Sequence, residues 1–391
     1  MAHPLKHLLI PPCLLIAAAT QAQVGWLSVP LNPVIGISAD GTTLVGQDPV
    51  TQRAAVWTTG DGLTVLAPYD DAEVASEATC ASWDGSVVAG FMTLSDQSVH
   101  GFRWSASTGK VDLGQPPRPY SSPQPTAISA DGSVIVGRIQ SGLLGFTWTA
   151  ATGMTLFTSP QFETVELDGI SADGKVVMGN GRTVQGCYTT FVWSEALGLV
   201  GPPCSDGESV VGNGLSGDGL TIVGTDTLFR NLAFRWRLGQ GRQYVGSGMN
   251  TFAYGTNFDG EVITGRLVDP FSGIYSPELG PLRTDLYLVR FGVHALFENQ
   301  GSEVRLTSAN GDVFVLRRFF PVTSYAYVKI CAANCDGSTV VPVLNANDFA
   351  CFLDRFAAGD ARANSDSSSV SPILNAIDFQ QFLNLFAAGC P

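Results

Sequence analysis

The chain has 391 residues, 45% of them hydrophobic, so it is long enough for two or three domains with real cores. Its formal net charge of −13 argues against nucleic acid or an anionic membrane as the main partner, because phosphate binding needs a basic face. Low overall charge with 44 glycines favours an all-β, exported protein with many tight turns.

Residues 1–22 have the pattern of a secretion signal. Lys6 precedes an apolar run over 8–19, and Thr20 and Ala22 supply small residues for cleavage after Ala22. A membrane anchor is the alternative, but the run is too short to span a bilayer. No later stretch is long and apolar enough to span one, so we expect a secreted or cell-surface protein.

A repeat of about 44 residues dominates the predicted second segment, residues 23–328. The motif "ISADGTTLVG" begins at Ile37, and close copies begin at Ile128, Ile170 and Leu215, with looser ones at Ala81 and Thr256. The Asp-Gly pairs, 41 to 47 residues apart, begin at Asp40, Asp84, Asp131, Asp173, Asp218 and Asp259. Some 16 to 20 residues after the first five pairs comes a Trp, at Trp57, Trp104, Trp148, Trp193 and Trp236.

Each repeat reads as three or four short strands. Asp-Gly between two β-rich runs predicts a hairpin with positive φ at both central residues. Such units cannot bury their faces alone, which favours a closed β-propeller of six or seven blades; an open β-solenoid is the alternative. "TSANGDVFVL", from Thr307, reads as a seventh copy, and "GWLSV" at Gly25 could complete the last blade and close the ring.

The repeated pattern from Ile35 to Gly265 resembles the HAF-type extracellular repeats of bacteria. This resemblance implies secretion and a propeller-like fold rather than a particular reaction.

The repeats show no catalytic constellation. The turn itself explains the repeated Asp, and core packing explains a Trp at a fixed place better than a carbohydrate platform does. Only two histidines follow the signal, His100 and His294, so a Ser-His-Asp site has few candidates for its histidine base. A carboxylate pair for glycoside hydrolysis has candidates, but nothing marks any two as facing each other. These candidates are Glu73, Glu77, Glu163 and Glu166.

The cysteines suit an oxidising compartment. Cys187–Cys204 is a plausible local disulfide, which leaves Cys80 over. Four cysteines after Tyr327 suggest two disulfides whose pairing stays open, with Cys335–Cys351 and Cys331–Cys390 among the possibilities. Zinc is a weak alternative, because histidines are few and there is no C-x-x-C pair.

The predicted third segment, residues 329–391, contains one small module written twice. "NANDFACFLDRF" at 345–356 returns thirty residues later as "NAIDFQQFLNLF", each after a run of alternating Asn, Asp and Ser. Side-chain oxygens at every second position, followed by a carboxylate at the start of a helix, suit calcium. Asp348 and Asp378 hold that carboxylate position. A helix N-cap without metal is the simpler alternative, but it does not easily explain the alternating run twice.

Each predicted helix has one apolar face and is too short to be stable alone, so we expect the two faces to pack together. The faces contain Phe349, Phe352, Leu353 and Phe356 in the first copy and Phe379, Phe382, Leu383 and Phe386 in the second.

Residues 334–391 resemble a dockerin, the duplicated calcium-loop module that binds cohesin domains, and most closely the planctomycete type that ends in Gly-Cys. The resemblance implies two all-α calcium-loop–helix units. The first site would use Asn334, Asp336, Ser338, Asn345 and Asp348, and the second Asn364, Asp366, Ser368, Asn375 and Asp378. The first loop spans 15 residues instead of the usual 12, and two carboxylates per site predict weak binding, about 0.1–1 mM.

Together these features predict an exported, non-enzymatic binding or display protein. A β-propeller would be attached through a calcium-binding, dockerin-like module to a cohesin-like domain or surface scaffold, with Arg355 and Asn384 as candidate partner contacts. A glycan is a possible ligand of the propeller. The alternative is a dockerin-attached polysaccharide hydrolase or lyase that uses propeller carboxylates.

Overall fold

The computed structural model describes most of the chain after the predicted signal. The described residues are 26–140, 143–204, 209–227, 230–290, 302–319, 323–330, 346–359, 363–365 and 374–388. The predicted signal peptide, residues 1–22, lies outside them.

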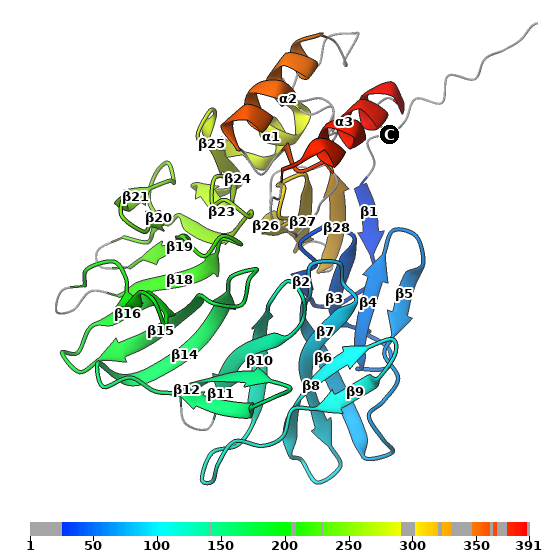
Figure 1. The fold of residues 1–391 in the computed structure, drawn as a ribbon, viewed down its shortest axis with the longest axis vertical. Helices are drawn as coiled ribbons and strands as arrows, with labels where there is room; N and C mark the ends of the chain where they lie inside the picture. Colours follow the sequence, from blue (N-terminus) through cyan, green and yellow to red (C-terminus); the bar gives the residue numbers. More distant parts are fainter. Residues whose placement is uncertain are drawn as a thin grey trace, which may run out of the picture.

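The described residues form seven four-stranded antiparallel sheets, arranged as blades around one axis (Figure 1). In blades 1 to 6 the strand order follows the chain from the innermost strand outward, so each repeat builds one blade. The predicted β-propeller is therefore confirmed, with seven blades. The alternative, an open solenoid, is wrong, because blade 7 joins the two ends of the array.

The strands have the following bounds. Blade 1 contains β2 (Val34–Ile37), β3 (Thr43–Gln47), β4 (Ala54–Thr58) and β5 (Gly62–Val65). Blade 2 contains β6 (Glu73–Ala81), β7 (Val87–Leu94), β8 (Val99–Ser105) and β9 (Gly109–Asp112). Blade 3 contains β10 (Pro123–Ile128), β11 (Val134–Ile139), β12 (Leu144–Thr149) and β13 (Gly153–Phe157). Blade 4 contains β14 (Phe162–Ile170), β15 (Val177–Thr183), β16 (Tyr188–Ser194) and β17 (Gly198–Val200). Blade 5 contains β18 (Val210–Leu215), β19 (Thr221–Asp226), β20 (Leu232–Arg237) and β21 (Gly241–Tyr244). Blade 6 contains β22 (Phe252–Thr256), β23 (Ile263–Val268), β24 (Phe271–Ser276) and β25 (Gly280–Arg283). Blade 7 contains β26 (Ser302–Thr307), β27 (Val313–Arg318), β28 (Ser324–Lys329) and β1 (Trp26–Val29).

Blade 7 closes the ring with strands from both ends of the propeller segment. The N-terminal strand β1 pairs antiparallel with β28, with Trp26 opposite Val328 and Val29 opposite Tyr325. This confirms that "GWLSV" completes the last blade and that "TSANGDVFVL" is a seventh copy. An unpaired strand edge at each end is thereby removed, which is the usual advantage of a closed array.

The turn of the repeated motif differs from the predicted hairpin. The strands on either side of Asp40-Gly41 end at Ile37 and begin again at Thr43, so the connection has five residues. Only the glycine has positive φ, +75° at Gly41. The Asp keeps an ordinary backbone conformation because its side chain closes the turn, with the Asp40 carboxylate accepting the Thr42 N–H at 3.0 Å.

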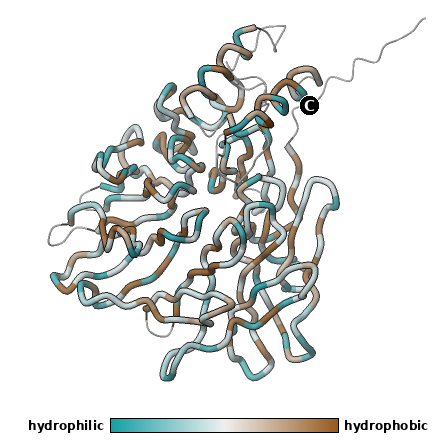
Figure 2. Tube along the Cα trace, viewed as in Figure 1, coloured by the Kyte–Doolittle hydropathy of each residue, from teal (hydrophilic) through white to brown (hydrophobic). Residues whose placement is uncertain are grey.

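The core lies between neighbouring blades rather than at one centre. One cluster, for example, packs Val45 of blade 1 against Val88 and Phe102 of blade 2. The repeated Trp belongs to clusters of this kind, which confirms its predicted packing role: Trp57, Trp148 and Trp236 are buried. Figure 2 shows the resulting alternation of hydrophobic and hydrophilic residues along the strands.

Three helices occur among the described residues. Helix α1 (Thr284–Arg290) follows blade 6 and was not predicted; its Tyr287 and Leu288 are buried in the core beside Phe314. Helices α2 (Ala346–Ala358) and α3 (Ala376–Ala388) form the helical C-terminal part, outside the ring of blades in Figure 1. Across the described ranges, no helix has both the length and the apolar character needed to cross a membrane.

Candidate functional site

One end of the central channel is lined by the repeated turn motif. The first and third residues of each motif, from Ile37 and Ala39 of blade 1 to Thr307 and Ala309 of blade 7, surround a cavity of about 220 Å³. Its lining residues, all of them described, carry no titratable group. Trp83 and Phe258 meet there in an edge-to-face contact, with ring centroids 5.8 Å apart. This end is therefore an apolar closure rather than a site for acid–base chemistry.

A ring of backbone hydrogen bonds holds this end together. The third or fourth residue of each motif donates its N–H to the carbonyl of the third residue in the next blade, at 2.7–3.0 Å. The series begins with Asp40 N–H to Trp83 O and returns with Ala309 N–H to Ala39 O. Seven such bonds join the blades in the described chain, so the motif serves closure as well as the turn.

The Asp of the motif is used by the turn, as predicted. In blade 3, Asp131 accepts hydrogen bonds from the Ser129 hydroxyl at 2.7 Å and from the Ser133 N–H at 3.0 Å. The Ser129 bond is the main cause that lowers the pKa of Asp131. The Ser129 oxygen in turn accepts the Val134 N–H at 3.0 Å. The same pattern recurs around Asp40, Asp84, Asp173 and Asp218.

Deeper in the channel, every innermost strand has a β-bulge at the same place, two residues before the motif. The bulge residues are Ile35, Thr79, Thr126, Asp168, Asn213, Tyr254 and Arg305. Several of them bond to the next blade, as Thr79 does through its hydroxyl to Pro125 O at 2.8 Å. Bulges re-aim side chains and are common beside functional sites, so this layer is the candidate site.

Bulge residues of blades 1, 5, 6 and 7 line a cavity of about 380 Å³, which we call the channel pocket. Ile35, Asn213, Tyr254 and Arg305 come from innermost strands. Arg317 of β27 and Tyr325 of β28 reach it from blade 7. Its volume lies within the range of small-molecule sites. Convergent polar groups beside tyrosine rings make it a candidate binding site of the propeller.

Glu303 organises the blade 6–blade 7 side of this pocket. Its carboxylate accepts the Arg305 Nε–H at 3.0 Å and the Tyr254 hydroxyl at 3.4 Å. The Arg305 guanidinium lies 5.0 Å from the centroid of the Tyr254 ring. Burial, followed by the Glu303 charge, raises the pKa of Tyr254, so the phenol stays a neutral hydrogen-bond donor.

Two carboxylates lie on innermost strands on the other side of the ring. Glu77 and Glu166 lie at equivalent positions of β6 and β14, two residues before the bulge. Burial raises the pKa of both groups. They stand two blades apart, with Gln124 at the equivalent position of blade 3 between them. The structure therefore gives two perturbed carboxylates, but in non-adjacent blades.

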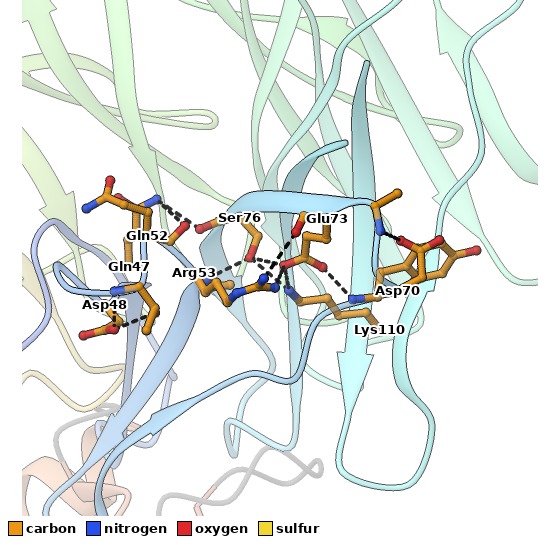
Figure 3. A network of polar contacts seen from close by, with 12 residues as sticks. Gln47, Asp48, Gln52, Arg53, Asp70, Glu73, Ser76 and Lys110 are labelled. Atoms are coloured by element: carbon orange, nitrogen blue, oxygen red, sulfur yellow. Dashed lines mark hydrogen bonds and ion pairs between the residues drawn. The ribbon is translucent and has the colours of Figure 1, made fainter. Parts of the chain in front are cut away.

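The other two carboxylate candidates are neutralised. Glu73 is fully buried and meets Lys110 Nζ at 2.5 Å, with Arg53 at 3.5 Å (Figure 3). The Ser76 hydroxyl and the Tyr69 N–H also donate to Glu73. Glu163 pairs with Arg182 at the exposed surface, at 3.3 Å. Both therefore serve as structural ion pairs.

In the C-terminal part, helices α2 and α3 pack through their phenylalanines. Phe352 and Phe382 stack with centroids 4.0 Å apart, and both are buried. The predicted contact between the two Phe faces is confirmed. Leu353 was assigned to the same face, but its side chain is 40% exposed, because the helix turns it away from its partner toward solvent.

The predicted metal ligands lie partly outside the described residues: Asn334, Asp336, Ser338, Asn345, Asp366 and Ser368 do so. Asp348 and Asp378 are fully buried at equivalent positions in the first turn of α2 and α3, and Asn364 is also buried. Asn375 caps α3, because its side-chain oxygen accepts the Ile377 N–H at 2.8 Å while Asp378 accepts the Asn375 N–H at 2.7 Å. This is the geometry of the N-cap alternative, seen in the second copy.

The candidate partner contacts lie on the outer sides of the same helices. Arg355 is half-buried in the last turn of α2, and Asn384 is exposed on α3, where its oxygen accepts a hydrogen bond from Gln380.

The cysteines of the propeller behave as expected. The Cys187–Cys204 disulfide is confirmed, and Cys80 is a buried free thiol. In the helical part Cys351 is also disulfide-bonded. The other three cysteines of the predicted C-terminal pairs, at 331, 335 and 390, lie outside the described residues.

No family model matches the chain, and no curated protein matches it. Among solved structures, an oligogalacturonate lyase in complex with manganese is similar, with a TM-score of 0.53 and 12% identity. The match covers 78% of this chain and 90% of that chain. A putative TolB from Agrobacterium tumefaciens gives a TM-score of 0.41 at 11% identity, covering 56% of this chain and 80% of that chain. At such identities the likeness to the lyase shows the propeller fold alone.

Proposed function

We propose that this chain is a secreted, non-enzymatic binding and display protein. The propeller binds a ligand, and the helical C-terminal part attaches it to a cohesin-like domain or surface scaffold as a calcium-binding, dockerin-like module. The observation that carries the proposal is the symmetry of α2 and α3. Two copies of one sequence make helices of equal length, which stack Phe352 on Phe382 and bury Asp348 and Asp378 at equivalent places.

Calcium is the ion that suits the donors of the two copies. Asp348 and Asp378 supply hard carboxylate oxygens at the helix starts, which is the ligand type that calcium prefers. The Asn, Asp and Ser residues before each helix would supply the remaining oxygens. Bound calcium would neutralise the buried carboxylates and brace the loops against the helix pair.

Calcium binding by the full-length chain tests this proposal directly. We expect isothermal titration calorimetry to detect calcium at about 0.1–1 mM. Asp348→Asn with Asp378→Asn should abolish that heat. Asp354→Asn is the matched control, because Asp354 lies on the exposed side of the same helix α2. Absence of any calcium heat, or equal loss in the control, contradicts the calcium part.

A polysaccharide hydrolase or lyase is the second candidate. The observation in its favour is that burial raises the pKa of two carboxyl groups, Glu77 and Glu166, at equivalent positions of the innermost strands β6 and β14. The similar lyase holds manganese, but the described residues contain no group of three or more His, Cys, Asp or Glu side chains that could ligate a metal. We therefore derive no step through manganese. Glycan cleavage that disappears in Glu77→Gln and Glu166→Gln would favour the enzyme over the display protein.

A further inference from the structure

We propose that the channel pocket binds a small acidic sugar, with Arg317 and Arg305 receiving its carboxylate. This deepens the proposed function by naming a ligand class for the propeller. The experiment below measures sugar binding alone, so its failure is distinguishable from a failure of calcium binding.

Arg317 is the strongest indication of an anionic ligand. Its guanidinium lies over the Phe319 ring, 4.8 Å from the ring centroid. Its Nε is buried and has no hydrogen-bond partner among the described residues, which leaves an unsatisfied donor at the pocket wall. Buried donors are almost always satisfied in folded proteins, because an unmade hydrogen bond is costly. The Arg317 side chain as a whole is half-buried and lines the pocket, so a carboxylate can bind its Nη groups and offset the cost of the buried Nε.

Arg305 offers a second donor to the same cavity. Glu303 holds its Nε–H, while its two Nη groups make no hydrogen bond in the part of the chain that the structure describes. Its side chain is 47% exposed, so a ligand can reach it. The planar fork of a guanidinium matches a carboxylate with two parallel hydrogen bonds, which makes arginine better suited than lysine to this task.

The remaining walls suit a ring that carries hydroxyl groups. Tyr254 presents aromatic surface with a polar end, which is useful against the mixed faces of a sugar, while Tyr325 lines the pocket as a buried residue. The amide nitrogen of Asn213 donates to Ala253 O at 2.8 Å, which leaves its side-chain oxygen to accept from a ligand hydroxyl. The cavity of about 380 Å³ has room for a small molecule.

The charge of the whole chain disfavours adventitious anion binding. A protein with a formal net charge of −13 repels anions over most of its surface, so non-specific anion binding is disfavoured. Glu303 balances the charge of Arg305, so Arg317 supplies the net positive charge of the pocket, and an anion must also fit the walls to bind there.

The test uses the full-length chain and three probes: sodium D-glucuronate, neutral D-glucose and acetate. We expect ligand-observed NMR to give a Kd of about 1 mM or tighter for glucuronate, and binding at least roughly tenfold weaker for glucose and acetate. Arg317→Met should weaken glucuronate binding at least roughly tenfold. Arg318→Met is the matched control, because alternate residues of β27 point to opposite faces, and it should leave binding within about twofold of the original.

Thermal melts show whether each variant is folded. Should Arg317→Met fail to fold, Arg317→Lys keeps the charge without the fork and should weaken glucuronate binding by about threefold to tenfold. If glucose binds as well as glucuronate, the pocket does not recognise the carboxylate. If acetate binds as well as glucuronate, the pocket does not recognise the sugar ring. Equal loss in the Arg317 and Arg318 variants overturns the site.

Discussion

The indole of Trp83 and the phenyl ring of Phe258 meet inside the ring of blades, with centroids 5.8 Å apart and planes at 70°. They come from blades 2 and 6 and occupy the third position of the repeated motif, where four of the other blades have Ala. Small residues at most of these positions leave the space that two large rings fill. One aromatic pair therefore narrows the end of the channel that the turns surround.

Removal of this pair should destabilise the propeller without unfolding any one blade. We expect Trp83→Ala to lower the free energy of unfolding by about 3–5 kcal/mol, because it leaves a cavity at the axis. The double variant with Phe258→Ala should show a coupling of about 0.5–1.5 kcal/mol in urea unfolding. Tyr69→Ala is the control, an aromatic 41% exposed whose loss should cost less than about 0.5 kcal/mol. A coupling near zero means that the two rings act independently.

The blades were predictable from the sequence because the turn motif recurs with little change. Gly at the fifth motif position and Ser at the second, as at Gly132 and Ser129, mark where the innermost strands end, with Asn257 in place of Ser in blade 6. The closure of the ring could be predicted because the strand-like stretch "GWLSV" at Gly25 stands before the first repeat and could complete the last blade. The turn geometry was predicted incorrectly, because the reach of the Ser129 and Asp131 side chains over the backbone is not visible in a pattern of β-rich runs.

The channel pocket was not predictable in the same way. Asn213, Tyr254 and Arg305 come from three blades and share no residue type, and Arg317 comes from another strand. The one signal that Asn213, Tyr254 and Arg305 share is their position, two residues before the motif of their own blade. Ile35 is the equivalent residue of blade 1. A search for polar residues at that offset would have found them, but only a closed ring shows that they meet.

The motif glycine should be essential for a steric reason as well as a conformational one. Gly132 has φ +68°, and a Cβ there would lie 2.7 Å from the Val87 side chain of the preceding blade. Gly153 has φ +64° but faces open space. We expect Gly153→Ala to cost about 1–2 kcal/mol from backbone strain, and Gly132→Ala about 2–5 kcal/mol because overpacking is added.

Chemical denaturation of the two alanine variants measures this difference. Val87→Ala combined with Gly132→Ala should recover only a small part of the loss, since it removes the two Val87 γ-carbons at 2.8 and 2.9 Å but keeps the Cβ at 2.7 Å. Equal costs at the two glycines would mean that the blades do not interlock through this contact.

The buried ion pair between Lys110 and Glu73 should be sensitive to loss of either partner. Both side chains are fully buried, and burial lowers the pKa of Lys110 while the Glu73 hydrogen bond opposes that shift. Lys110→Met should cost about 3–5 kcal/mol, because Glu73 is left buried with the more distant Arg53. Arg53→Met should cost about 1 kcal/mol, since Arg53 is partly exposed.

A combined variant separates the pair from its surroundings. Lys110→Met with Glu73→Gln removes both charges, so it should be more stable than Lys110→Met alone in urea unfolding. If the double variant loses the sum of the two single losses, Glu73 and Lys110 are not coupled.

Acid should weaken the turns that use an Asp. The Ser129 hydrogen bond, opposed by burial and aided by Ser133, lowers the folded-state pKa of Asp131 below its ordinary value of 3.8. The unfolded chain therefore binds the proton more readily than the folded one. The stabilisation is fully present well above pH 3.8 and is lost as the pH falls through the folded-state pKa.

Urea unfolding of Asp131→Asn at about pH 7 and about pH 3 tests the sign of this effect. At neutral pH the variant should be less stable than the original chain by about 0.5–1.5 kcal/mol, the net worth of a typical hydrogen bond. In acid the gap should narrow, because the native carboxyl is becoming protonated as well. The cost stays modest because an amide can still accept the Ser133 N–H, as Asn310 does from Asp312 in blade 7. Asp61→Asn is the control, since the Asp61 carboxylate accepts no hydrogen bond among the described residues, and it should change stability little at either pH. A gap that widens in acid contradicts the assigned direction of the shift.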